Sequence, residues 1–473
     1  MRFPGDPIGQ HLLRVRLRCT GVAVDVADLL RCPRCEGGLT PADSSAAAWH
    51  CKDCGREFPT VAGIPLLLVD PHEERRQWSY QLHEFAREVD RARDRLLAQL
   101  SGETIPAGAR ARMQRLHEGL VAHRDGIVAR FEAAGVTPVS RQAKDRDRVP
   151  GEGTVTAYYD QMFRDWVWGD AEISAALAQV VAAWPSGRSL GRCLVLGAGA
   201  GRLPCEVVRA IGADVAVALD LNPLPYLVLA ALQRGQTVAL AELPQQARTS
   251  HDVLVPRTLS AERPPVELSL VFADGLRPPV AAGTFDTVMT PWFIDQVPPD
   301  AADLIRTITE LLPAGGRWLN HGPLIYHPNH TRYAHRYRVD ELRQMLVDAG
   351  WTIDAWSYEP LPYMHSPVSS QGRTEHVLTF VATRGDAVAT HEPAPRPAWL
   401  DDPDEPVPRL PGLDEYAPPH PMFAAVIALV DGRRSIRAIA AEMVARHGLP
   451  ADAAEVGVTG CLQQIARALG IAI

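Results

Sequence analysis

Lysine, long hydrophobic runs and a secretory signal are scarce or missing in this sequence. Lysine occurs only at Lys52 and Lys144, so arginine carries almost all of the positive charge, and we infer nothing functional from that bias. Apolar stretches are interrupted by charge before they reach the roughly 18 residues that a membrane span needs. The first 21 residues lack an apolar core followed by a small-residue cleavage site. We therefore expect a cytoplasmic protein with no membrane partner.

Length, composition and charge limit the classes of protein to which this chain can belong. A chain of 473 residues exceeds the roughly 100–200 residues of one domain, so we expect several domains. With 46% hydrophobic and 22% charged residues, the composition is that of a globular protein with large cores. The formal net charge of -8 argues against nucleic acid as the main partner. None of these features predicts an oligomeric state.

Four of the eight cysteines fall within residues 32–54, as two C-x-x-C pairs separated by fifteen residues. Two such pairs provide the tetrahedral sulfur set of structural zinc ribbons and leave no open position for a catalytic water. A redox pair and disulfides are the competing interpretations, and disulfides are disfavoured in an intracellular chain. We therefore predict a structural Zn²⁺ bound by Cys32, Cys35, Cys51 and Cys54.

The sequence around these cysteines, residues 29–69, resembles the small zinc-ribbon protein that accompanies and activates several RNA and protein methyltransferases. We accordingly assign residues 1–70 to a zinc ribbon. Residues 71–153 follow as a helical segment, in which apolar residues recur at three- and four-residue steps in two stretches. We expect two amphipathic helices that break at 101–108 and pack on the main domain, then a charged connector at 141–153.

Strand and helix patterns alternate through residues 154–388, as in a doubly wound α/β domain. An apolar strand enters a loop with Gly197, Gly199 and Gly201, where the backbone turns sharply and a ligand can approach closely. The dinucleotide fingerprint wants Gly or Ala at the position of Arg202, which disfavours NAD or FAD. The next strand ends at Asp220, where a carboxylate can accept hydrogen bonds from both hydroxyls of a ribose.

This glycine loop and acidic strand end resemble those of the class I S-adenosylmethionine-dependent methyltransferases, which have a Rossmann-like α/β fold. The resemblance implies that S-adenosylmethionine is the cofactor and that the loop, the adjacent Arg202 and Asp220 bind it. It also places Asp274, in the segment VFADG, against the adenine. The alternative for Asp274 is that it caps a loop.

A carboxylate and an imidazole follow two further predicted strands. An apolar β-prone run before Asp295, a helical stretch, and a second strand before His327 form one strand-helix-strand unit. Because ligands collect at the carboxyl ends of the strands in open α/β sheets, we expect Asp295 and His327 to face one bound substrate. The alternative is a helix-capping Asp295 and an ordinary surface His327.

Four segments, in order, resemble the carnosine N-methyltransferase family, which methylates a ring nitrogen of histidine in a small peptide. The resemblance implies that Gln161 and Arg164 contact the cofactor, Arg164 at the methionine carboxylate, and that Asp295 and His327 contact the acceptor imidazole. A surface ion pair is the alternative for Arg164. The four segments are QMFRDW at 161–166, LVLGAGAGRLPCEV at 194–207, WFID at 292–295 and LNHGPLIYHP at 319–328.

Imidazole chemistry suits these roles. Methyl transfer from a sulfonium is an in-line displacement, so the acceptor nitrogen must present its lone pair behind the methyl carbon. A carboxylate that accepts the N–H of the other ring nitrogen fixes the tautomer and raises the nucleophilicity of the attacking one. Asp295 fits that orienting role. The family has a tyrosine-rich run near the last strand, but this chain has Arg373, Thr374 and His376 there. The acceptor can therefore differ from that of the family. Tyr363 is a candidate for an aromatic wall beside the acceptor.

Ten of the 31 residues at 391–421 are proline, so we predict an extended linker over 389–421. Residues 422–473 have the spacing of three short helices, with Ser435 as a cap. This segment resembles the small winged-helix peptide-binding domain of pyrroloquinoline quinone biosynthesis. The resemblance implies a peptide acceptor presented by this domain, and the alternative is a helical cap or a dimerisation element.

Together these features predict a Rossmann-like class I methyltransferase domain joined to a zinc ribbon, a helical insertion and a small helical domain. The predicted reaction transfers a methyl group to an imidazole nitrogen of a histidine-containing small molecule or peptide. The alternatives are an N- or O-methyltransferase of another natural-product or peptide precursor, and a non-catalytic cofactor-binding scaffold.

Overall fold

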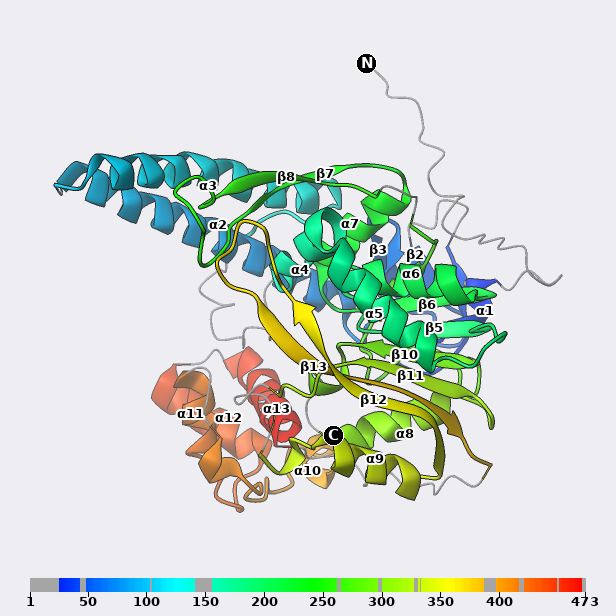
Figure 1. Cartoon of the computed structure of the whole chain (residues 1–473). Helices are drawn as coiled ribbons and strands as arrows, with labels where there is room; N and C mark the ends of the chain where they lie inside the picture. The colour runs from blue at the N-terminus through cyan, green and yellow to red at the C-terminus, as the bar shows by residue number, and fades with distance from the viewer. Residues whose placement is uncertain are drawn as a thin grey trace.

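The fold is organised around one seven-stranded sheet, seen in a computed structural model of the chain (Figure 1). Its strand order is β12-β13-β11-β10-β5-β6-β9, parallel from β9 to β11 and antiparallel at β13 and β12. The strands are β5 (Arg192–Leu196), β6 (Val215–Asp220), β9 (Ser269–Phe272), β10 (Thr287–Pro291), β11 (Arg317–Gly322), β12 (Trp351–Tyr363) and β13 (Arg373–Arg384). The structure describes residues 25–42, 48–102, 104–140, 155–261, 265–296, 300–326, 331, 333–386, 397–416, 421–448 and 451–469.

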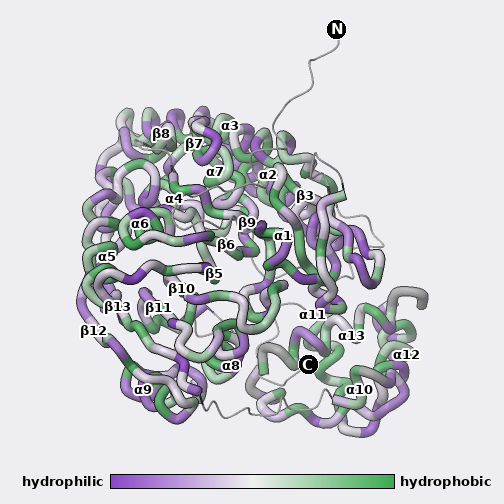
Figure 2. Tube along the Cα trace, turned by 90° about the vertical axis from the view of Figure 1, so that its right-hand side faces the viewer, coloured by the Kyte–Doolittle hydropathy of each residue, from purple (hydrophilic) through white to green (hydrophobic). Residues whose placement is uncertain are grey.

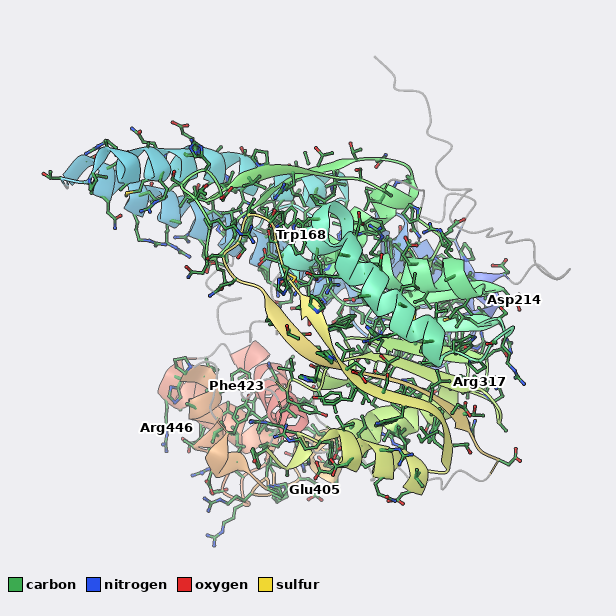
Figure 3. All side chains as sticks on the ribbon, in the orientation of Figure 1. Trp168, Asp214, Arg317, Glu405, Phe423 and Arg446 are labelled. Atoms are coloured by element: carbon green, nitrogen blue, oxygen red, sulfur yellow. The ribbon has the colours of Figure 1, made fainter. Side chains whose placement is uncertain are left out.

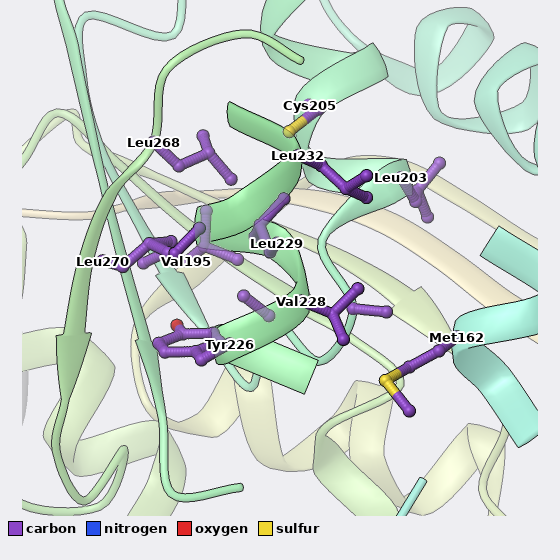
Figure 4. Close-up of a cluster of buried hydrophobic side chains, with 14 of the residues drawn as sticks. Met162, Val195, Leu203, Cys205, Tyr226, Val228, Leu229, Leu232, Leu268 and Leu270 are labelled. Carbon is purple, nitrogen blue, oxygen red and sulfur yellow. The ribbon is translucent and has the colours of Figure 1, made fainter. Parts of the chain in front are cut away.

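Alternating side chains along the parallel strands build two cores, one on each face of the sheet. In β5, Val195 lies in one core and Leu194 in the other. Figure 4 shows part of the first core, to which Val195 of β5 and Leu229 and Leu232 of α7 (Pro223–Gln233) belong. The first core includes α5 (Asp170–Ala183), α6 (Arg202–Ile211) and α7, and the second includes α8 (Ala301–Leu311) and α9 (Val339–Asp348). The predicted doubly wound α/β organisation is therefore confirmed.

A small antiparallel sheet near the N-terminus shares its core with the large sheet. Its order is β1-β2-β3-β4, and its buried residues join both cores, with Phe58 in the second and Val61 and Ile64 in the first. Leu66 forms a parallel bridge with Phe272 of β9, and the N–H of Leu67 donates to the Phe272 carbonyl over 2.9 Å. The predicted ribbon thus extends the edge of the large sheet. Its elements are α1 (Val26–Leu29), β1 (Leu39–Pro41), β2 (Ala48–Cys51), β3 (Glu57–Val61) and β4 (Ile64–Pro65).

Two long helices form an arm, α2 (Pro71–Gly102) and α3 (Ala107–Ala133), which break where the sequence predicts a break. The arm extends away from the sheet in Figure 1, beside the hairpin β7 (Val238–Glu242) and β8 (Val255–Leu259). At its base, buried residues of both helices, among them Leu82 and Ile127, join the first core. Over the described residues, no helix is long and apolar enough to cross a membrane. The predicted connector at 141–153 lies outside the described residues.

The C-terminal helices have a core of their own, and Figure 2 shows them as a separate group beside the sheet. The three predicted helices are present, and the Ser435 hydroxyl caps the second by accepting the N–H of Ala438 over 3.2 Å. The extended linker predicted over 389–421 is corrected for residues 397–416, because apolar side chains between its prolines are buried in this core. These side chains are Trp399, Val407, Leu410 and Leu413, and the helices are α10 (Ala398–Asp401), α11 (Pro421–Ile427), α12 (Ile436–His447) and α13 (Ala451–Ala468).

We expect Leu410→Ala to destabilise the C-terminal helices by about 2–5 kcal/mol, because it leaves a cavity where a side chain only 4% exposed had packed. Hydrogen exchange of α12 amides measures this loss of protection. Val456→Ala, at a side chain 70% exposed on α13, is the matched control and should change little. Equal protection in both variants would show that residues 397–416 are a linker after all.

Candidate active site

A cavity of about 580 Å³ opens at the carboxyl ends of the parallel strands. Its walls come from the turns after β5, β6, β9, β10 and β11, from the segment before α5, and from the β12–β13 hairpin. This edge of an open α/β sheet is where ligands usually bind. Most of the predicted site residues line the cavity, namely Gln161, Arg164, Gly197, Gly199, Asp220, Asp274 and Asp295. Gly201 and Arg202 do not line it, and His327 lies outside the described residues.

The glycine loop needs glycine for two different reasons. All three glycines have positive φ, which favours residues without a side chain. A Cβ at Gly199 would meet nothing within 4 Å, so this backbone is open to a ligand. A Cβ at Gly201 would instead lie 2.3 Å from the side chain of Leu229, a residue of α7. Gly201 therefore serves the packing of α7 against the loop.

Asp220 is buried at the end of β6 and supports the glycine loop directly. Oδ2 accepts the N–H of Gly199 over 2.7 Å, and Oδ1 accepts both the backbone N–H and the side-chain amide of Asn222, each over 2.8 Å. Burial raises the pKa of Asp220 above its ordinary value, although these N–H donors oppose that shift. Each carboxylate oxygen can accept more than one hydrogen bond, so Asp220 retains the capacity to accept from ribose hydroxyls.

Asp274 caps a loop, the alternative considered for it, and it also lines the cavity. Its Oδ1 accepts the N–H of Leu276 over 2.9 Å, and its Oδ2 lies 3.3 Å from Nε of Arg277. The residue therefore caps its loop while it lines the cavity. Ribbon residues hold the same loop, because the N–H of Arg31 donates to Pro279 over 2.7 Å and Leu30 bridges Val280.

The segment that carries Gln161 and Arg164 contains a rare wide helical turn. Residues Tyr159–Phe163 form α4, and Arg164–Trp168 continue as a π-helix, a geometry that often marks functional sites. Arg164 is buried, and its Nε and Nη2 donate to Oδ1 of Asp165 over 3.0 and 2.8 Å. The ion pair that we considered for Arg164 thus exists, but it lies inside the protein and on the cavity wall.

Arg202 has a different place from the predicted one. Its guanidinium donates to the backbone carbonyl of Asp165 over 2.8 Å and also pairs with Asp170 and Glu206. Since it does not line the cavity, we replace the predicted cofactor contact with an anchoring role. Arg202 fastens the π-helical segment to the start of α6.

Two aromatic residues form one wall of the cavity, and the sequence analysis missed one of them, Trp292. The rings of Trp292 and Tyr363 stack at 5.7 Å, and the Arg164 guanidinium lies 4.8 Å from the Tyr363 ring. Trp292 directly follows β10 and has a φ of 47°, an uncommon conformation for a bulky residue that often accompanies function. Tyr363, which we considered as an aromatic wall, does line the cavity. The quoted WFID segment contained this signal in its tryptophan.

Asp295 lies just after β10 and is only 3% exposed. Its Oδ2 accepts the N–H of Ile325, which follows β11, over 3.0 Å. Its Oδ1 is buried and accepts no hydrogen bond from any residue that the structure describes. Burial raises the pKa of Asp295 to about 6, so the carboxylate is still ionised at neutral pH. A buried acceptor without a partner on a cavity wall is a binding site for a donor.

Two residues of β13 also face the cavity. Arg373 and Glu375 line it, whereas His376 packs on Tyr358 at 5.4 Å and does not. Glu375 is buried and accepts the Trp292 indole N–H over 3.2 Å. Where carnosine N-methyltransferases have a tyrosine-rich run, this chain therefore has an arginine and a glutamate that line the cavity. Glu375 was missed because strand register alone decides which residues of β13 point inward.

The four ribbon cysteines converge. Their sulfur atoms all lie within 4.8 Å of one another, with Cys35 and Cys51 at 3.5 Å and Cys32 and Cys54 at 3.8 Å. A tetrahedral zinc with Zn–S bonds of about 2.3 Å requires sulfur separations of about 3.8 Å. The arrangement therefore fits a Zn²⁺ ion.

Comparison with known proteins points to one family for part of the chain. Residues 246–383 match the sequence model of the carnosine N-methyltransferase family. A stretch of 116 residues is 30% identical to a carnosine N-methyltransferase of Dictyostelium discoideum, and it covers 24% of each protein. The chain thus matches about a quarter of that relative's length. The matched region contains Asp295, Tyr363 and Arg373, and it supports an S-adenosylmethionine-dependent methyltransferase.

Solved structures with a partial likeness include two S-adenosylmethionine-dependent methyltransferases. One, from Methanosarcina mazei, is 13% identical and covers 41% of this chain and 92% of its own, with a TM-score of 0.29. The other, from Mesorhizobium loti, is 17% identical and covers 45% of this chain and 100% of its own, also with a TM-score of 0.29.

We expect Asp295→Asn to stabilise the fold above pH 6. Because burial lifts the folded-state pKa to about 6, above the unfolded-state value of about 3.9, the ionised carboxylate destabilises the fold. The gain should approach about 3 kcal/mol at pH 7.5 and vanish below about pH 4. Urea unfolding across this pH range measures it.

Asp286→Asn is a control for which we expect a stability change of the opposite sign. Partial burial at Asp286 is outweighed by hydrogen bonds from Arg192, which lower the pKa of its carboxyl. This variant should lose stability at pH 7.5. A destabilised Asp295→Asn protein at that pH would mean that the carboxylate has partners which the described residues do not show.

Proposed function

We propose that this chain is an S-adenosylmethionine-dependent N-methyltransferase that transfers a methyl group to an imidazole nitrogen of a histidine-containing small molecule or peptide. The observation that carries the proposal is the buried Oδ1 of Asp295, which has no hydrogen-bond partner among the described residues and lies in the same cavity as the glycine loop. The family match over residues 246–383 supports the reaction type, and Asp295 falls within it.

The cavity fits the cofactor at the end formed by β5, β6 and β9. Gly199 leaves its backbone open, Asp220 has spare acceptor capacity for ribose hydroxyls, and Asp274 lines the wall beyond it. Arg164 and Gln161 lie on the same cavity wall, as expected if they hold the methionine end. When bound, S-adenosylmethionine supplies the electrophilic methyl group.

The acceptor end is built around Asp295. Its Oδ1, which no described residue occupies, can accept the N–H of an imidazole, and this leaves the lone pair of the other ring nitrogen available for attack. Because the carboxylate is buried, its attraction to the imidazolium formed by transfer is strong. The stacked Trp292 and Tyr363 offer flat faces to a ring and to a developing cation.

Two parts of the proposal rest on resemblance. His327 as a second contact to the acceptor stays a prediction, since the structure describes the chain only up to Tyr326 there. Presentation of a peptide by residues 422–473 also stays a prediction. The peptide-binding domains that this segment resembles add a peptide strand to the edge of a strand pair. In the described residues ahead of these helices, the structure has instead an isolated bridge between Pro406 and Ser435.

The test is a methyl-transfer screen with labelled cofactor against histidine, histidine dipeptides and histidine-bearing peptides. We expect transfer to an imidazole and a loss of about 100-fold in turnover for Asp295→Asn, with cofactor affinity unchanged. Asp214→Asn is the matched control, an exposed carboxylate at the opposite edge of the sheet (Figure 3). Full turnover in Asp295→Asn, or transfer only to acceptors without histidine, would reject the proposal.

We also propose that Cys32, Cys35, Cys51 and Cys54 hold one structural Zn²⁺. The ribbon contacts the loop after β9 through Leu30, Arg31 and Leu67. Loss of the metal should therefore disturb Asp274 as well as the ribbon itself.

Removal of zinc by a chelator should release about one ion per chain, lower the thermal stability and weaken S-adenosylhomocysteine binding. Elemental analysis, thermal unfolding and calorimetry measure these effects. Cys35→Ser should reproduce them, whereas Cys461→Ala, a buried cysteine of the C-terminal core, should retain the metal. A chain that purifies without zinc and still binds the cofactor would contradict this assignment.

A further inference from the structure

The β12–β13 hairpin extends beyond the end of the parallel sheet. The last residue of β11, Gly322, pairs with Leu378 of β13, but β12 and β13 continue to pair as far as Tyr363 and Arg373. Arg373 thus lies five residues past the sheet edge, about 17 Å at the rise of a strand. The overhang brings Tyr363, Arg373 and Glu375 to the cavity wall.

Arg373 is the more accessible of the two arginines among the described cavity-lining residues. Its side chain is 62% exposed, whereas Arg164 is buried and tied to Asp165. Its Nε and Nη2 reach the same oxygen of Glu375 over 2.6 Å, and its guanidinium lies 4.7 Å from the Tyr363 ring. A guanidinium has five N–H donors, so an arginine bound through one edge can still bind an anion through another.

We propose that Arg373 binds a carboxylate of the small molecule in the cavity, and that this carboxylate belongs to the methyl acceptor. This inference rests on the proposed function and names the acceptor class, an imidazole compound that carries a free carboxylate. Glu375 and the Tyr363 ring hold the guanidinium in place, so that little rotamer freedom is lost when the acceptor binds.

The strand order assigns the carboxylate to the acceptor. Asp274, Asp220 and the glycine loop follow β9, β6 and β5, whereas Arg373 lies on β13, beyond β10 and β11. Asp295 follows β10, between the glycine loop and the hairpin. An acceptor oriented by Asp295 therefore has the glycine loop on one side and Arg373 on the other, although Arg164, the proposed partner of the methionine carboxylate, lies by the same Tyr363 ring as Arg373. The methionine carboxylate of the cofactor is the competing source of the same chemistry, and the experiment separates the two.

The test compares N-acetylhistidine with N-acetylhistidinamide, which differ only in the carboxylate. With S-adenosylhomocysteine bound, wild type should bind N-acetylhistidine about 10-fold more tightly than the amide, and Arg373→Gln should bind both equally. The kcat/KM values for methyl transfer should change in the same ratio. Binding of S-adenosylhomocysteine itself should be unchanged in Arg373→Gln, and a 10-fold loss there would assign the carboxylate to the cofactor and overturn the inference.

The double variant Arg373→Gln/Glu375→Gln controls for the second role of Arg373, which is to neutralise a buried carboxylate. If the preference for N-acetylhistidine returns in the double variant, Arg373 acts only through Glu375 and the inference is wrong. Persistent loss of the preference supports direct binding. Equal binding of the two acceptors by wild type overturns the inference but leaves the proposed function standing if transfer occurs. Absence of transfer to either acceptor would count against the imidazole acceptor itself.

Discussion

A buried carboxylate with one oxygen lacking a described partner is the constraint around which this site is built. Taking Asp295 out of water raises its pKa to about 6, although hydrogen bonds oppose this shift, the largest of them from the N–H of Ile325. That N–H is in place because β10 and β11 are adjacent parallel strands whose ends meet at one edge. The fold thus maintains an electrostatic cost at Asp295 that a matching donor on a ligand would relieve.

The other parts of the chain hold the walls around that carboxylate. Arg202 fastens the π-helical segment that carries Arg164, and the ribbon holds the loop that carries Asp274. The hairpin overhang contributes Tyr363, Arg373 and Glu375 from the far side. Segments remote in sequence therefore position one cavity, and each does so through a few backbone or charge-assisted hydrogen bonds.

The parallel sheet and its helices were predictable because hydrophobic periodicity and glycine breaks are local signals. The residues at or just after strand ends, such as Asp220 and Asp295, were predictable for the same reason. Non-local pairing was not: the bridge of Leu66 to Phe272 joins segments about two hundred residues apart. Proline content suggested a linker, yet apolar residues such as Leu410 pack between the prolines. Glu375 depended on strand register, and Arg202 on partners in α5 and the π-helical segment.

The central claim is that Asp295 orients an imidazole beside the cofactor. A crystal structure of the protein with S-adenosylhomocysteine and imidazole tests it most directly. The account predicts an imidazole nitrogen about 2.6–3.2 Å from Oδ1 of Asp295, with the other nitrogen directed at the cofactor sulfur. An imidazole bound elsewhere, or an Asp295 whose Oδ1 is satisfied by another protein group, would contradict it.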